Sequence, residues 1–101
     1  MGIKLRFKAK ADGDIVKVKG LIKHPMLSYD QAKKAGKEAN FITYIKAENN
    51  GEIVFEANTS QFLSKNPVIK FAFKGGKSGE TVKIYVEDLK GNKAEKEFKI
   101  K

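Results

Sequence analysis

Hydrophobic and polar residues alternate with a period of two along most of this chain. In residues 3–10 the odd positions are apolar and the even positions are Lys or Arg. Successive side chains of a β-strand point to opposite faces of its sheet, whereas a helix repeats its apolar positions every three or four residues. The alternation returns in residues 16–23, 41–47, 53–57, 68–74, 82–86 and 98–100. The pattern therefore predicts about seven short strands, with Ile53, Phe55 and Ala57 among the inward side chains.

Turn-forming residues separate these strands. Asn49-Asn50-Gly51 supplies the positive φ angles of a tight hairpin, and residues 12–14 and 90–92 form similar breaks. Short strands with turns every 8 to 12 residues or so are typical of a sandwich. We expect an all-β fold, an immunoglobulin-like antiparallel β-sandwich of about seven strands. The 101 residues fit one domain, residues 1–101.

Two stretches do not alternate. Residues 28–36 contain Asp30 near the start and Gly36 at the end of a short helical pattern. Residues 58–67 place Phe62 and Leu63 between polar residues and end in Asn66-Pro67, which is typical of a turn or an extended dipeptide.

The chain is strongly basic, with 21 Lys and Arg residues against 12 acids and a net charge of +9. This charge attracts anionic partners of any kind. The outward lysines are explained by the need to keep an exposed sheet in solution and to prevent edge-to-edge pairing; recruitment of an anion is the alternative. No stretch has the length of a signal peptide or a membrane span, so we expect no membrane insertion.

The residues that catalysis requires are scarce. There is no cysteine and only one histidine, His24, which argues against thiol chemistry and against a metal site. No Gly-x-Ser-x-Gly pattern supports a serine nucleophile. Gly76-Lys77-Ser78 resembles the end of a phosphate-binding loop, but Phe71 stands where the first glycine is needed and a strand pattern follows. We therefore expect no enzymatic activity, no cofactor and no metal.

A small basic β-domain that binds single-stranded nucleic acid is the alternative function. Such domains stack bases on exposed aromatic side chains set among lysines. Most aromatic residues here fall in the inward phase, and the candidates for exposure are Tyr29, Tyr44, Phe62 and Tyr85. Lysines outnumber arginine by 20 to one, whereas phosphate and base recognition favours arginine. We expect no nucleic-acid partner.

Three segments of the chain carry distinctive motifs. Residues 13–26 form a strand pattern that ends in the corner His24-Pro25-Met26. Residues 62–75 contain a Ser-x-Asn-Pro-x-x-x-Phe-x-Phe run, and residues 79–91 have the pattern of a closing hairpin. In order and spacing the three segments resemble the SoxZ family, the Z subunit of the SoxYZ sulfur carrier complex. The chain departs from the family after Met26, where Leu27-Ser28-Tyr29 replaces Glu-Thr-Gly, so the loop of residues 27–40 is expected to differ.

The resemblance implies a non-catalytic subunit that pairs with SoxY, whose C-terminal cysteine arm carries the sulfur substrate during thiosulfate oxidation. It also implies transient contact with other Sox enzymes, and a periplasmic location reached by export together with a signal-bearing partner. The positions expected to contact a partner or to shape the loops are His24, Pro25, Met26, Ser64, Lys65, Asn66 and Pro67.

Overall fold

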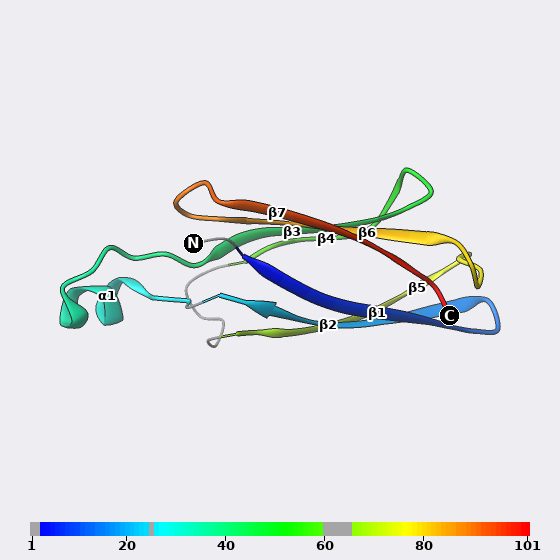
Figure 1. The fold of residues 1–101 in the computed structure, drawn as a ribbon, viewed down its shortest axis with the longest axis horizontal. Coiled ribbons are helices and arrows are strands. Elements are labelled where there is room, and N and C mark those ends of the chain that lie inside the picture. Colours follow the sequence, from blue (N-terminus) through cyan, green and yellow to red (C-terminus); the bar gives the residue numbers. More distant parts are fainter. Residues whose placement is uncertain (1–2, 25, 60–65) are drawn as a thin grey trace.

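The protein is a two-layered β-sandwich, seen in a computed structural model that describes residues 3–24, 26–59 and 66–101 (Figure 1). Its strands and its helix are β1 (Lys4–Asp12), β2 (Ile15–Lys23), α1 (Tyr29–Ala35), β3 (Ile42–Asn49), β4 (Glu52–Asn58), β5 (Val68–Lys74), β6 (Thr81–Asp88) and β7 (Lys93–Lys99). All paired strands are antiparallel. The predicted all-β sandwich of about seven strands is confirmed.

One sheet has the strand order β1-β2-β5 and the other β4-β3-β6-β7. The arrangement differs from that of antibody constant domains, because β4 pairs with β3 instead of joining the first sheet. Stacked rings of Phe55 and Phe71, with centroids 4.4 Å apart, join the edge strands β4 and β5. At the opposite edge the chain end crosses to β1, where the Lys101 amide donates to the Ala9 carbonyl at 3.0 Å.

The core lies between the two sheets, where the inward side chains of both meet. Strand β6 alternates strictly between half-buried and buried positions, as its sequence predicts. The largest fully buried side chains are branched aliphatics: Ile22, Ile42, Ile45, Ile84, Ile100, Val16, Val18, Val82 and Val86. Their removal from water is the main source of the fold's stability.

The predicted orientation of Ile53 is wrong, because its side chain is 56% exposed. The β3–β4 register shifts between Ala47 and Glu48, so Ala47 lies opposite Phe55 while Glu48 lies opposite Ile53. An extra residue in one strand reverses the facing of everything beyond it. A second shift, between Ile42 and Tyr44 in the pairing with β6, accompanies the burial of both Phe41 and Ile42 at the start of β3.

The helix α1 lies at one end of the molecule, beyond the ends of the strands (Figure 1). Ser28 caps it by accepting a hydrogen bond from the Gln31 amide, and the Gln31 side chain accepts one from the Ser28 amide. Gly36 ends it with a left-handed φ of 67°. This capping box and glycine stop confirm the helix predicted for residues 28–36.

Candidate functional site

The two segments singled out in the sequence meet at the end of β2. The His24 amide donates to Asn66 Oδ1 at 3.0 Å, and the Asn66 amide donates to the His24 carbonyl at 3.0 Å. Pro67 is buried next to them, and its carbonyl accepts a hydrogen bond from the Ile22 amide at 3.0 Å. Residues 42 positions apart in the sequence are thereby fixed to one another.

The His24 ring is buried, with only 4% of the residue exposed, and both of its nitrogens are engaged. The Met26 amide donates to Nδ1 at 3.0 Å, so Nδ1 carries no proton. Nε2 lies 3.0 Å from Asp88 Oδ2 and therefore holds the ring proton that it donates to this carboxylate. The hydrogen bonds select the neutral Nε2–H form of the imidazole.

Asp88, at the end of β6, is the centre of this cluster. Its carboxylate accepts from His24 Nε2, from Asn40 Nδ2 at 2.9 Å, and from both the amide and Nδ2 of Asn92 at 2.8 and 3.0 Å. Burial alone raises the pKa of Asp88, but the hydrogen bonds from Asn92, His24 and Asn40 together outweigh it and hold the pKa below its ordinary value. The site thus keeps a buried carboxylate ionised.

This lowered pKa makes the fold sensitive to acid. An unfolded aspartate binds its proton at a pH of about 4, whereas folded Asp88 does so at lower pH. The stability that Asp88 contributes is fully present above the pKa of the unfolded state, and it is lost as the pH falls through the pKa of the folded state. Urea unfolding between pH 7 and pH 2 should show this loss, and the slope below about pH 4 should be smaller in Asp88→Asn. An unchanged slope in that variant would assign the acid sensitivity to other carboxylates.

The cluster connects both sheets with the loop that carries the helix. His24 follows β2 of one sheet, Asp88 ends β6 of the other, and Asn40 precedes β3. Asn40 also accepts from the Lys90 amide at 3.2 Å. His24 was identified from the sequence, but its partner Asp88 was missed, and so were Asn40 and Asn92, which donate to Asp88. The only signal was Asp88 at the end of a strand and four residues before Asn92, a spacing that suits a side chain closing its own turn.

Met26 contributes packing and one unusual contact. Its side chain is 3% exposed, and its sulfur accepts a hydrogen bond from the Ile42 amide at 3.3 Å. Its backbone has a positive φ of 47°, which is rare for a residue other than glycine. Four of the expected positions, His24, Met26, Asn66 and Pro67, thus lie in one corner, which we call the His24 corner. Pro25, Ser64 and Lys65 lie outside the described residues.

Asn66 offers a direct test of how this corner is held. Its φ is 50°, a conformation that Asn tolerates better than Ala does. Asn66→Ala removes the acceptor of the His24 amide and strains the backbone, so we expect a loss of about 1 to 3 kcal/mol. Asn66→Gly removes the acceptor only and should cost less. Chemical denaturation of the three proteins measures this order; equal stability of the alanine and glycine variants would contradict the backbone argument.

The arrangement can hold loops together, but it presents no reactive atom to a substrate. The imidazole and the carboxylate are 2% and 1% exposed and are used by internal hydrogen bonds. The exposed phenol of Tyr44 donates to Glu56, a hydrogen bond that raises the Tyr44 pKa to about 12 and keeps it protonated at neutral pH. Within the described part of the chain, no group of three or more His, Cys, Asp or Glu side chains could hold a metal ion.

The aromatic candidates for base stacking are largely engaged with one another. Tyr44 and Tyr85 meet edge to face at 6.1 Å on the outer side of the four-stranded sheet, and Lys46 lies over the Tyr85 ring. Tyr29 is 58% exposed and packs edge-on against Phe41. Phe62 lies outside the described residues.

Comparison with protein families matches residues 3–99 to the family model described as sulphur oxidation protein SoxZ. The chain belongs to the SoxZ family. Membership gives it a role in the Sox system of sulfur oxidation, which is associated with the periplasm. The described residues include no helix long and apolar enough to cross a membrane. No curated protein sequence matches the chain.

Solved structures with the same fold include proteins of other functions. A hypothetical protein from Pyrococcus horikoshii OT3 has a TM-score of 0.68 and 16% identity over 100% of this chain and 90% of its own. The superoxide reductase (neelaredoxin) from Archaeoglobus fulgidus in the reduced form has a TM-score of 0.63 and 19% identity over 94% and 86%. The superoxide reductase from Ignicoccus hospitalis has a TM-score of 0.61 and 14% identity over 100% and 81%. At such identities this SoxZ-family chain shares their fold alone.

Proposed function

We propose that this chain is the non-catalytic subunit of a SoxYZ-type sulfur carrier. It forms a heterodimer with a SoxY-type subunit, and the partner's cysteine arm holds the sulfur while thiosulfate is oxidised. This chain stabilises the carrier and offers a surface to the enzymes that load, oxidise and release the bound sulfur. The heterodimer works in the periplasm, which this chain reaches by export with its partner.

The observation that carries the proposal is the state of the chain's one histidine. A covalent sulfur carrier needs a soft nucleophile, and the sequence contains no cysteine. The two ring nitrogens of the one histidine, His24, are held by Met26 and Asp88 inside the protein. Together with membership of the SoxZ family, this supports a division of labour in which the reactive atom belongs to the partner.

Co-expression tests the heterodimer directly. This chain and a SoxY-type protein, with an affinity tag on the partner only, should purify as a complex with one copy of each. Light scattering after size exclusion gives the stoichiometry. The matched control replaces the tagged partner with an unrelated sandwich of similar size, which should retain none of this chain. Two separately eluting proteins would overturn the proposal.

A further inference from the structure

The outer face of the β1-β2-β5 sheet is cationic almost without interruption. Strand β1 contributes four exposed Lys or Arg side chains, β2 three and β5 two. Within these three strands, all of which the structure describes, Asp12 is the only acidic residue, and it lies at the end of β1, 3.6 Å from Lys17. We call this surface the basic face.

The register places like charges directly opposite one another. Lys8 faces Lys19, and Lys19 faces Lys70, so one row of lysines crosses all three strands. Lys10 faces Lys17 in the next row. Like charges in directly opposed positions destabilise a sheet, because the side chains are only about 5 Å apart at their Cβ atoms. The isolated domain therefore carries a repulsion that an anionic partner would relieve.

Solubility does not require this repulsion, as the other sheet of the same chain demonstrates. Its outer positions pair opposite charges across the strands: Lys46 with Glu56, Lys83 with Glu97, and Glu87 with Lys93. Such pairs keep a sheet charged and soluble while they attract each other. The outer face of one sheet thus opposes like charges, whereas the outer face of the other opposes unlike charges. The need to keep an exposed sheet in solution therefore does not explain the lysine rows of the basic face.

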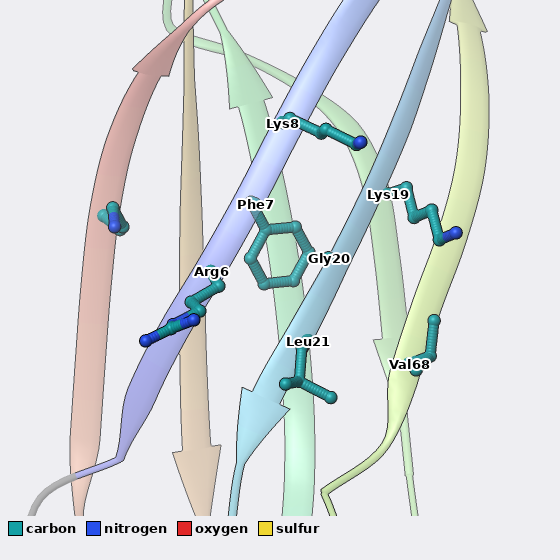
Figure 2. Close-up of a pocket in the computed structure, with 8 residues that line it drawn as sticks. Arg6, Phe7, Lys8, Lys19, Gly20, Leu21 and Val68 are labelled. Carbon is teal, nitrogen blue, oxygen red and sulfur yellow. The ribbon is translucent and has the colours of Figure 1, made fainter.

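The basic face also has an apolar patch, which lies beside the central lysine row toward the end of β2. Leu21 lies directly opposite Val68 on one side and Arg6 on the other, and Val68 is 55% exposed. Leu21, Val68, Arg6, Lys8 and Lys19 are among the residues that line an open hollow of about 490 Å³. Figure 2 shows these side chains on the three neighbouring strands. An apolar patch bordered by charge is typical of protein–protein interfaces.

Within its three described strands, the basic face has no exposed aromatic rings on which the bases of a nucleic acid could stack. The aromatic residues of its strands point inward: Phe7 stacks on Phe98, Phe71 stacks on Phe55, and Phe73 is buried. Bases would find no ring to stack on. Lysine, a strongly hydrated charge on a flexible stem, is depleted from the cores of stable interfaces, so the contact should be reversible.

We propose that the basic face is a reversible docking surface for an acidic protein surface that places an apolar side chain among its carboxylates. The inference rests on the proposed function, in which enzymes that act on the carrier must bind it transiently. It adds which face they use and what chemistry their own surface has. Lys8, Lys19 and Lys70 form the electrostatic part of the site, and Leu21 with Val68 the apolar part.

The test uses the heterodimer, so that its formation is measured first and separately. In the test variant, Lys8→Glu, Lys19→Glu and Lys70→Glu reverse the central row. In the control, Lys77→Glu, Lys93→Glu and Lys99→Glu change the net charge equally at exposed positions away from this face. Circular dichroism and co-purification establish that both variants fold and pair. Absence of any heterodimer would count against the proposed function and not against the face alone.

Each purified Sox enzyme that loads, oxidises or releases the sulfur is then titrated against the three heterodimers. We expect at least one enzyme to bind the wild type, to bind the test variant about 10 to 100 times more weakly, and to bind the control within about threefold of the wild type. Affinity for the wild type should fall steeply with added salt. Leu21→Ser combined with Val68→Ser should also weaken binding, but the affinity of this variant should fall with added salt as steeply as that of the wild type.

Four outcomes would overturn the docking surface. One is an equal loss of affinity in the test and control variants, which would mean that net charge alone matters. A second is wild-type affinity in the test variant, and a third is that no enzyme binds the wild-type heterodimer even at low salt. The fourth is binding of a single-stranded oligonucleotide or of anionic phospholipid vesicles at physiological salt in preference to the enzymes.

Discussion

Replacing Asp88 with alanine should lower the free energy of unfolding by about 3 to 5 kcal/mol, because the buried donors around the carboxylate lose their acceptor. These donors come from His24, Asn40 and Asn92, and the Asp88 side chain that receives them is 1% exposed. Domains of this size have a total stability of about 5 to 15 kcal/mol, so the variant should lose a large share of its stability.

Urea denaturation of the single chain measures the effect of Asp88→Ala, with Glu52→Ala as the matched control at an exposed acid of an edge strand. The control should change the stability by less than about 0.5 kcal/mol. If Asp88→Ala does not fold, Asn40→Ala and Asn92→Ala each remove part of the same donor set and should cost about 1 to 2 kcal/mol. A loss below about 1 kcal/mol for Asp88→Ala would contradict the account of the buried cluster.

Gly20→Ala should destabilise the fold by about 2 to 3 kcal/mol, although a glycine inside a strand is ordinarily a weakness. Gly20 lies in the middle of β2, directly opposite Phe7 of β1. A Cβ atom at this position would lie 2.1 Å from Cδ2 of the Phe7 ring, which covers the glycine. The ring would have to turn away and would lose its stacked contact with Phe98, whose centroid is 6.0 Å away.

A double-mutant cycle separates this overlap from a general effect of alanine. In a Phe7→Leu background the smaller side chain leaves room, so Gly20→Ala should cost at least 1 kcal/mol less than in the wild type. Denaturation of the four proteins gives the coupling energy. Additive effects of the two substitutions would show that the Phe7 ring does not determine the need for glycine.

Strand positions follow from local pattern, and for that reason most of the fold could be predicted from the sequence. The alternation in residues 82–86 requires only that one face be buried, and β6 buries Val82, Ile84 and Val86 completely. The helix was predictable from residues 28–36 because its capping residues act within the same segment. Ile53 was misplaced because a register shift depends on how β3 pairs with β4, which no local pattern reveals.

The His24 corner was only half predictable for a related reason. Resemblance to SoxZ motifs drew attention to His24 and Asn66, but the carboxylate that binds the ring comes from a position 64 residues away. Asp88 carries no periodic signal of its own, since a polar residue at a strand end is normally exposed. The need for glycine at position 20 could not be predicted either, because it depends on the Phe7 ring of the neighbouring strand.

Intact-mass spectrometry of the loaded heterodimer tests most directly whether the reactive atom lies outside this chain. The reconstituted pair is incubated with thiosulfate, the loading enzyme and an electron acceptor, which takes up the two electrons released when thiosulfate is joined to the cysteine thiol. The two subunits are then separated under non-reducing conditions. The account predicts added sulfur mass on the SoxY-type partner, removable by a thiol reductant, and an unchanged mass for this chain. Covalent sulfur on this chain, above the level in a control without the loading enzyme, would contradict it.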